Sequence, residues 1–448
     1  MEISEELLAV LSCPQSALPL TLKDKQLVTV DEQIHYPIIN QIPWLLRNPL
    51  HSMVDWSVKL NHFNQVLSDE IRQLNNEIKK APKPTLARLQ LLLKGKQAFQ
   101  QSVSHLVSPI LKAKVSSKPV YDALSDRAPH TQNLLSYESN LYRDWVWGEE
   151  ENQITADILL EHTKDISTDS LLVLGAGSCR LAYDLHQAIA PKMTVANDIN
   201  PLLLFAAHQL FSGRSLPIYE FPVHPRNAQS VAIEHKISPL KSWPDNFYML
   251  FSDAATPALK KSAFELVVTP WLIDIQPFEL VTFMRAINHY LPIGAHWLNF
   301  GSLVFNQKRD SFCYAIDEVK EMAAQAGFEI ADITEHEIPY LKSPYSAGYR
   351  VERVWCWRAV KTQEVKAQTN LQNLPDWIVD ISKTIPLTRE IKSFSFNHSL
   401  YAELTALIDG KKSIHQIAKK VAREKSMDEN EAISMVKNFY LKIVQQSL

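Results

Sequence analysis

A glycine-containing turn between two apolar stretches is the part of the sequence best suited to bind a ligand. Gly175 and Gly177 follow the apolar run LLVL and precede the amphipathic stretch RLAYDLH. Glycine lets the backbone turn sharply and approach a ligand with no Cβ in the way. The start of the predicted helix offers free backbone N–H groups to an anionic group. The segment therefore predicts a binding turn between a strand and a helix.

Acidic residues follow three further predicted strands. Asp198 ends the run VAND, where a carboxylate can accept hydrogen bonds from both ribose hydroxyls of a nucleoside. Asp253 follows another predicted strand, and Asp274 ends the run FELVVTPWLID. Ligands bind at the carboxyl ends of the strands in open α/β sheets, so we expect these carboxylates to share one cleft. Nicotinamide enzymes and methyltransferases share the spacing of the glycine turn and the first carboxylate, so it does not separate the two classes.

The composition is typical of a globular protein with several domains. The chain has 448 residues, of which 46% are hydrophobic and 21% charged, and its net charge is −3. This charge gives no general attraction to nucleic acid or to an anionic membrane, and we expect neither as a partner. No apolar run reaches the roughly 20 residues of a membrane span, and the acidic N-terminus is unlike a signal peptide. Four scattered cysteines form no CxxC pair, so we expect a cytoplasmic protein.

Four segments follow one another along the chain. Residues 1–47 predict a small β-rich module, and residues 48–125 carry helical periodicity that the breaker APKP interrupts. Residues 126–365 alternate short apolar runs with amphipathic stretches, which predicts an α/β domain with a mainly parallel sheet. Residues 366–448 begin with a polar linker and continue as a helical tail. The strongest strand candidates are LLVLGAG, MTVAND, FELVVTPWLID and GAHWLNFGSLVF.

Five patches give the third segment a specific resemblance. They are NLYRDWVWGEEEN, LGAGSCRLAYDL, ANDINPLLL, TPWLIDIQ and HWLNFGSLVFN. In this order they resemble the carnosine N-methyltransferase family, whose members use S-adenosylmethionine to methylate the imidazole of a histidine-containing dipeptide. The resemblance covers about residues 50 to 362. It implies the Rossmann-like α/β fold of class I methyltransferases.

The resemblance also implies a set of site residues. Asp274 would hold the substrate imidazole, Asn306 stands where the family has a substrate-contacting histidine, and Tyr349 is the predicted closing tyrosine of the pocket. The chain departs from the family at Cys179, where a glycine is usual, and at Asp198, where the family has glutamate. The implied cofactor residues are Asn140 and Arg143 at the amino-acid end of S-adenosylmethionine, Gly175 and Gly177 beneath it, Asp198 at the ribose, Asp253 and Ala254 at the adenine, and also Arg180, Ile199 and Pro270.

The two ends of the chain resemble small accessory modules. The N-terminal module is similar to zinc-ribbon-like proteins that partner methyltransferases, but it keeps only Cys13 of the two cysteine pairs. A tetrahedral zinc site cannot be built from one cysteine, and the histidines match no ligand spacing, so we expect no metal. The tail is similar to PqqD-like winged-helix domains, which bind a leader peptide by adding its strand to a sheet edge. A leader peptide or protein partner is one interpretation of the tail, and a stabilising appendage without a ligand is the other.

The leading interpretation is an S-adenosylmethionine-dependent N-methyltransferase that acts on an imidazole of a small peptide, such as a carnosine-like dipeptide. A neutral imidazole has one N–H and one lone-pair nitrogen, so a carboxylate at Asp274 that accepts the N–H directs the other nitrogen at the methyl group. The first alternative is a larger peptide or protein histidine recruited by the C-terminal domain. A second alternative is a catalytically inactive scaffold. A nicotinamide oxidoreductase is less favoured, because the chain lacks a second half-sheet with its own nucleotide turn.

Overall fold

The computed structural model describes residues 3–111, 137–307, 309–367 and 384–447. These residues belong to two compact units, Met1–Asn373 and Leu374–Leu448, which are described separately. Parts of the predicted helical segment, of the start of the α/β domain and of the polar linker lie outside the described residues. Within the described ranges we find no helix with the length and apolar character of a membrane span.

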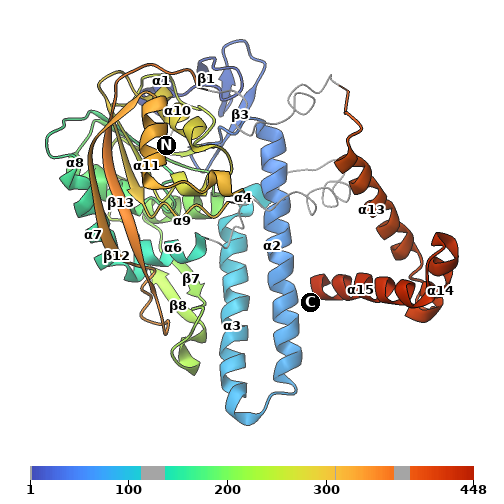
Figure 1. Cartoon of the computed structure of the whole chain (residues 1–448). Helices are drawn as coiled ribbons and strands as arrows, with labels where there is room; N and C mark the ends of the chain where they lie inside the picture. The colour runs from blue at the N-terminus through green and yellow to red at the C-terminus, as the bar shows by residue number, and fades with distance from the viewer. Residues whose placement is uncertain (1–2, 112–136, 308, 368–383, 448) are drawn as a thin grey trace. The chain divides into compact units, whose positions relative to one another are not determined.

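A seven-stranded sheet forms the centre of the first unit (Figure 1). Its order is β12-β13-β11-β10-β5-β6-β9, and the five strands from β11 to β9 are parallel. The hairpin β12–β13 joins β11 in antiparallel orientation. The four strongest strand candidates all coincide with strands of this sheet. The bounds are β5 Ser170–Leu174, β6 Met193–Asp198, β9 Phe247–Phe251, β10 Leu266–Pro270, β11 His296–Gly301, β12 Phe328–Tyr340 and β13 Arg350–Lys361.

Helices cover both faces of this sheet. Alternate residues of β5 show this, because Leu171 and Val173 belong to one hydrophobic core while Leu172 and Leu174 belong to the other. Burial on both faces explains why the parallel strands are almost continuously apolar in the sequence. The fold is therefore the mainly parallel α/β architecture that the sequence predicts. The helices that follow or precede these strands are α7 Glu149–Glu161, α8 Arg180–Ile189, α9 Pro201–Phe211, α10 Leu280–Tyr290 and α11 Ile316–Gln325.

A long helical hairpin packs beside the sheet (Figure 1). It consists of α2 Pro49–Ile78 and α3 Lys83–Leu106, and the predicted breaker APKP lies at their junction. The short helix α4, Ser108–Leu111, follows them. Gly95 of α3 lies against a two-stranded ribbon, since a Cβ on this glycine would come within 3.1 Å of Tyr219 in the first strand of the ribbon. The ribbon was not predicted from the sequence, and its strands are β7 Leu216–Glu220 and β8 Ile233–Ile237.

The N-terminal module docks on the open edge of the central sheet. Trp44 forms a parallel bridge with Phe251 of β9, and the backbone N–H of Leu45 donates to the Phe251 carbonyl at 2.8 Å. Cys13 is buried, and its Sγ lies 3.0 Å from the Tyr36 hydroxyl. The described residues contain no group of three or more His, Cys, Asp or Glu side chains placed to hold a metal ion. The module comprises α1 Glu5–Val10, β1 Leu20–Lys23, β2 Gln26–Thr29, β3 His35–Ile39 and β4 Ile42–Pro43.

We expect Trp44→Ala to destabilise the first unit by about 3–5 kcal/mol, because it removes a large and fully buried side chain. The Trp44 ring lies 4.7 Å from the Phe251 ring, and its indole N–H donates to Ser52 Oγ at 2.8 Å. Urea unfolding measures the change. Val30→Ala, on an exposed side chain of the same module, is the control and should alter stability by less than about 0.5 kcal/mol. Equal midpoints for the two variants would contradict a stabilising role for the docked module.

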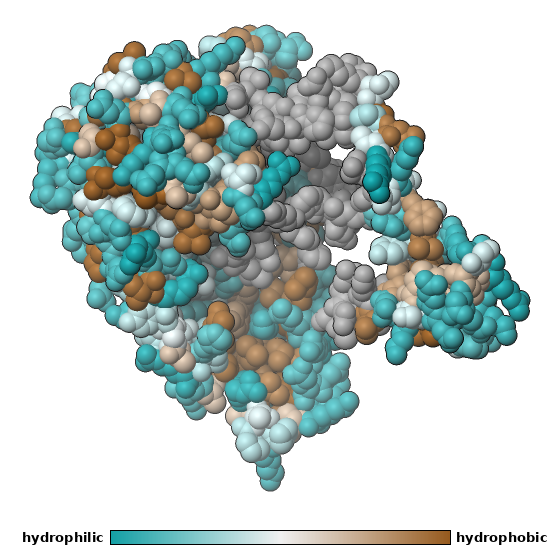
Figure 2. All heavy atoms as spheres, viewed as in Figure 1, coloured by the Kyte–Doolittle hydropathy of each residue, from teal (hydrophilic) through white to brown (hydrophobic). Residues whose placement is uncertain are grey.

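The second unit has a small helical core. Its helices are α13 Arg389–Ala406, α14 Ile414–Lys425 and α15 Glu429–Ser447, and hydrophilic side chains dominate its visible face (Figure 2). Residues 384–447 contain no strand, so a sheet edge for a leader peptide is not among the described residues. The resemblance of this tail to PqqD-like domains stays a prediction. The buried core residues are Leu404, Ile417, Ala418, Val421, Ala422, Ala432 and Val436.

Candidate active site

A cavity of about 530 Å³ lies at the carboxyl ends of the parallel strands. The turn after β5, the ends of β6, β9 and β10, the segment from Tyr137 to Thr155 and the β12–β13 hairpin all contribute to its wall. We call it the strand-end cavity. Most of the predicted site residues line it, namely Asn140, Arg143, Gly175, Gly177, Asp198, Ile199, Asp253, Ala254, Pro270 and Asp274. Arg180, Asn306 and Tyr349 do not.

The glycine turn after β5 has the backbone conformation that the sequence predicts. Gly175 and Gly177 have φ angles of +72° and +56°, in the left-handed region that favours glycine. A Cβ at Gly177 would meet only Leu203 Cδ1, at 3.9 Å, so the backbone here faces open space beside the cavity. Cys179 also has a positive φ, of +63°, where the family has glycine. The cysteine therefore has the same turn conformation as the glycine of the family. This conformation costs energy, because a residue with a Cβ is strained in the left-handed region.

Two carboxylates are fixed at neighbouring strand ends. Asp198 Oδ2 accepts the Gly177 N–H at 2.7 Å, and its Oδ1 accepts the Asn200 N–H at 2.7 Å. Asp253 follows β9 and accepts the Ala255 N–H at 3.0 Å. Burial raises the pKa of both carboxyl groups, and the backbone hydrogen bonds oppose this shift. The cavity thus presents two preoriented acceptors that are suited to hydroxyl or amino groups of a ligand.

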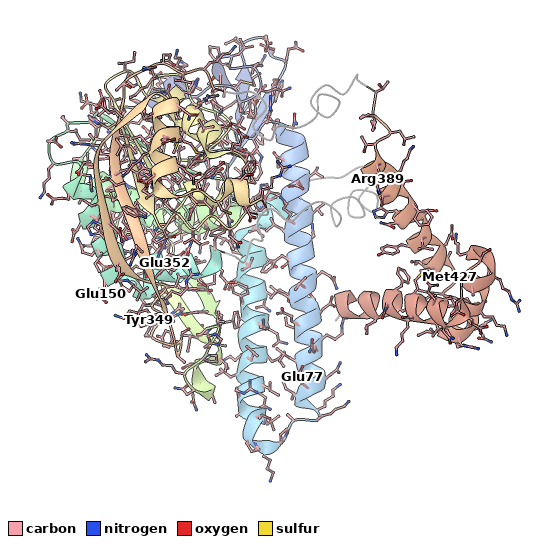
Figure 3. The ribbon with its side chains drawn as sticks, viewed as in Figure 1. Glu77, Glu150, Tyr349, Glu352, Arg389 and Met427 are labelled. Carbon is pink, nitrogen blue, oxygen red and sulfur yellow. The ribbon has the colours of Figure 1, made fainter. Side chains whose placement is uncertain are left out.

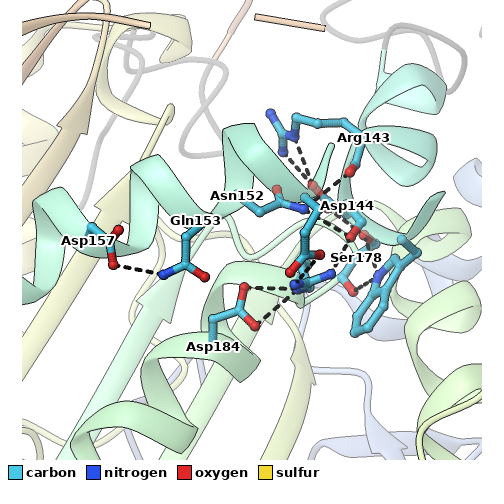
Figure 4. A network of polar contacts seen from close by, with 10 residues as sticks. Arg143, Asp144, Asn152, Gln153, Asp157, Ser178 and Asp184 are labelled. Atoms are coloured by element: carbon cyan, nitrogen blue, oxygen red, sulfur yellow. Dashed lines mark hydrogen bonds and ion pairs between the residues drawn. The ribbon is translucent and has the colours of Figure 1, made fainter. Parts of the chain in front are cut away.

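The segment before α7 carries Asn140 and Arg143. Asn140 lies in α6 (Glu138–Tyr142), and Arg143 begins a π-helix, Arg143–Trp147. Arg143 pairs with Asp144 at 2.8 Å and with Glu151 at 3.6 Å, and Figure 4 shows the surrounding polar network. Burial raises the pKa of Glu151 to about 7, and the positive charge of Arg143 opposes the shift. Because π-helical turns often occur at functional sites, this local geometry agrees with a binding role for the segment.

Arg180 lies outside the cavity. Its guanidinium pairs with Asp184 and Glu149, both at 2.9 Å, and donates to the Asp144 carbonyl at 3.0 Å. It also stacks over the Trp145 ring, with Cζ 5.5 Å from the centroid. These contacts tie α8 to the π-helix, and Arg180 does not line the cavity in which a cofactor contact was predicted.

Asp274 follows β10 in the chain and lines the cavity. It lies in a short 3₁₀ helix, Ile273–Ile275, and is 7% exposed. Its Oδ2 accepts the Val304 N–H at 3.1 Å. Burial raises the pKa of this carboxyl, and the nearby charge of Glu352 raises it further. The neighbouring Trp271 has a φ of +51°, a strained conformation of the kind that recurs at functional sites.

The other two predicted substrate residues are corrected by the structure. Asn306 is exposed and does not line the cavity. Tyr349 is 55% exposed and lies in the loop between β12 and β13, with Lys342 Nζ 5.5 Å from its ring centroid (Figure 3). Tyr340, at the end of β12, and Tyr137 are the tyrosines that line the cavity. The loop carries the predicted tyrosine away from the cavity wall.

The β12–β13 hairpin supplies cavity residues that the sequence analysis missed. Arg350 and Glu352 of β13 line the cavity together with Tyr340 of β12. Alternation along β13 puts Arg350 and Glu352 on one face of the strand, but it does not tell which face meets the cavity.

The architecture, the cavity and a sequence match together define the class of protein. A mainly parallel sheet, a glycine turn after β5 and a carboxylate at the end of β6 agree with a class I methyltransferase, although nicotinamide enzymes share the turn and the carboxylate. A sequence model of the carnosine N-methyltransferase family matches residues 127–363, which is more than half of the chain. The chain belongs to this family and is an S-adenosylmethionine-dependent N-methyltransferase.

Two solved methyltransferase structures are similar to about half of this chain at low identity. NodS, an N-methyltransferase from Bradyrhizobium japonicum solved with S-adenosylhomocysteine, is 12% identical with a TM-score of 0.35, and the match covers 51% of this chain and 98% of that chain. An S-adenosylmethionine-dependent methyltransferase from Aquifex aeolicus is 12% identical with a TM-score of 0.31, and the match covers 49% of this chain and 92% of that chain. No curated protein matches the chain in sequence.

Proposed function

We propose that the chain transfers a methyl group to an imidazole nitrogen of a small histidine-containing peptide. The observation that carries this proposal is the buried carboxylate of Asp274, which lines the same cavity as the glycine turn and the two strand-end carboxylates. A cofactor bound at the glycine turn and an acceptor that contacts Asp274 would therefore share one cavity. Methyl transfer requires this proximity, because the reaction is a direct displacement that depends on alignment.

The cavity fits S-adenosylmethionine, which supplies an electrophilic methyl group when bound. Its volume of about 530 Å³ is in the usual range for cofactor sites. Asp198 would accept the ribose hydroxyls, Asp253 with Ala254 would hold the adenine, and Asn140 with Arg143 would contact the amino-acid end. The open space above Gly177 supports a close approach of the cofactor to the backbone.

Asp274 would orient the acceptor and stabilise its charge. If its carboxylate accepts the N–H of one ring nitrogen, the lone pair of the other nitrogen becomes the nucleophile. The ring gains positive charge as the new bond forms, and a buried carboxylate stabilises that charge. The described residues that line the cavity carry more acidic than basic side chains, which favours a cationic product. The acids are Asp144, Glu151, Asp198, Asp253, Asp274 and Glu352, and the bases are Arg143 and Arg350.

The rate is expected to fall with decreasing pH in two steps. Asp274 must be ionised to accept the ring N–H, and burial raises its pKa above the usual 3.8, so the active form is lost as the pH falls through this raised value. The free imidazole, with a pKa of roughly 6.5, must also be neutral. A plot of log(kcat/KM) against pH should therefore steepen from a slope of about one toward two at low pH. In Asp274→Asn, only the step caused by protonation of the imidazole should remain. If the second step is unchanged in this variant, Asp274 does not have the proposed role.

A direct assay tests the proposed function. The full chain is incubated with methyl-labelled S-adenosylmethionine and a dipeptide that carries histidine, and the product is examined by mass spectrometry and NMR. Label on a ring nitrogen supports the proposal. The same dipeptide with histidine replaced by phenylalanine is the matched control and should acquire no label. Label on a long peptide with an internal histidine, but not on the dipeptide, would favour the alternative of a recruited protein substrate. Absence of label from every imidazole compound would favour the scaffold.

A further inference from the structure

Asp144 is a buried carboxylate that contacts two parts of the wall of the strand-end cavity. Its side chain is 7% exposed, and its Oδ1 lies 2.9 Å from Nε and 2.8 Å from one terminal nitrogen of Arg143. Its Oδ2 accepts a hydrogen bond of 2.5 Å from the hydroxyl of Ser178. Ser178 follows Gly177 in the glycine turn, whereas Arg143 lies in the π-helix. Asp144 therefore joins the π-helix to the glycine turn, as Figure 4 shows.

The contact with Asp144 fixes one edge of the Arg143 guanidinium. This edge is formed by Nε and one terminal nitrogen, and a guanidinium holds its five N–H donors in a rigid plane. Contact along one edge leaves the donors of the opposite edge for other partners. Arg143 lines the cavity, and its side chain is 14% exposed. The opposite edge is thus held in one orientation beside the cavity.

The glycine turn is held by two carboxylates. Asp198 accepts the Gly177 N–H, and Asp144 accepts the hydroxyl of the next residue, Ser178, which is fully buried. Loss of Asp144 can therefore act on a ligand either through Arg143 or through the turn. The two routes differ in what they weaken. A displaced Arg143 would weaken the binding of an anionic group, whereas a disturbed turn would weaken every ligand of the cavity.

We infer that Asp144 is a positioning residue that orients Arg143 to bind the carboxylate at the amino-acid end of S-adenosylmethionine. The inference rests on the placement of that end at Asn140 and Arg143 under the proposed function, and not on the identity of the methyl acceptor. An arginine that is already fixed loses less conformational freedom when a carboxylate binds, and its planar donors match the two oxygens. The negative charge of Asp144 by itself disfavours an anionic ligand. The benefit to binding therefore comes from the acceptor oxygen that orients the guanidinium.

Calorimetric titration of the full chain with two ligands tests the inference. S-adenosylhomocysteine carries the amino-acid end, whereas 5′-methylthioadenosine has the adenine and the ribose without it. We expect Asp144→Ala to weaken binding of S-adenosylhomocysteine by about 10- to 100-fold and to leave the affinity for 5′-methylthioadenosine unchanged. Asp144→Asn should keep most of the affinity for both ligands, because its amide oxygen can still accept from Arg143.

Asp144→Glu separates position from charge and serves also if the alanine variant does not fold. Glutamate keeps the carboxylate but moves it by one methylene group, so it should weaken S-adenosylhomocysteine alone, by about 10-fold. Asp184→Ala is the matched control, because Asp184 pairs with the neighbouring Arg180 at 2.9 Å and does not line the cavity. This control should bind both ligands like the wild type.

Three results would overturn the inference. An equal loss for both ligands in Asp144→Ala would show that the carboxylate acts through the turn. A loss in Asp144→Asn as large as that in Asp144→Ala would show that the charge matters and the orientation does not. Equal affinity of the wild type for both ligands would show that Arg143 does not meet the amino-acid end. The titrations contain no methyl acceptor, so failure to methylate an imidazole would overturn the proposed acceptor and leave this inference standing.

Discussion

Replacing Asp274 with alanine is expected to lower kcat by about 100- to 1,000-fold while the affinity for S-adenosylhomocysteine stays unchanged. Under the proposed function, the alanine would remove both the acceptor for the ring N–H and the negative charge that would stabilise the methylated ring. Asp274→Asn keeps an acceptor oxygen but removes the charge, so its loss should be smaller. Because Asp274 accepts the Val304 N–H, the asparagine variant also preserves the local backbone better than alanine does.

Single-turnover kinetics and calorimetric titration measure the two quantities separately. Asp310→Asn is the matched control, because Asp310 is an exposed carboxylate that does not line the cavity. It should leave both the rate and the affinity unchanged. Wild-type turnover by Asp274→Ala would remove Asp274 from the mechanism. A parallel loss of cofactor affinity would instead show that the carboxylate maintains the cavity and does not act on the acceptor.

Local sequence was enough to place one part of the cavity wall. The turn at Gly175 and Gly177 has a signal of its own, because an apolar run, two glycines and an amphipathic stretch lie next to one another in the chain. Asp198 and Asp253 also follow apolar runs directly, and each lies at or just beyond the end of its strand. In a parallel sheet the carboxyl ends of neighbouring strands meet at one edge, so adjacency in space follows from the fold class.

The hairpin side of the cavity could not be placed in the same way. Tyr340 and Arg350 lie more than a hundred residues after the glycine turn in the sequence, and they reach the cavity only because β13 pairs with β11. The register of β12 against β13 also shifts between Ile330 and Asp332. A shift of one residue exchanges the two faces of a strand, so counting along the sequence does not identify which tyrosine faces the cavity.

Arg180 was misplaced for a different reason. It lies at the start of α8, and the family resemblance placed it among the cofactor residues. Its partners Glu149 and Asp184 turn the guanidinium toward the π-helix instead. A charged side chain takes the direction of its nearest opposite charges, and in this case one of them, Glu149, comes from a distant part of the sequence. Long-range pairing of this kind has no local sequence signal.

Replacing Asp198 with alanine is expected to weaken binding of S-adenosylhomocysteine by at least about 100-fold. Two hydroxyl hydrogen bonds to a carboxylate are lost, and bonds to a charged acceptor contribute about 1.5–3 kcal/mol each. Calorimetric titration measures the affinity. Asp157→Ala, on an exposed carboxylate of α7, is the control and should bind like the wild type. Full binding by Asp198→Ala would contradict the placement of the ribose at the end of β6.

The backbone contacts of Asp198 require a second variant, because the carboxylate also accepts the N–H groups of Gly177 and Asn200. Alanine removes these bonds together with the hydroxyl acceptors, so lost binding has two possible causes. Asp198→Asn keeps one acceptor oxygen of similar position and should weaken binding less than alanine. Asp198→Glu restores the residue that the family has here and keeps the charge, so it should bind more tightly than either variant. If all three variants lose affinity equally while their melting temperatures fall equally, the carboxylate holds the turn and the ribose lies elsewhere.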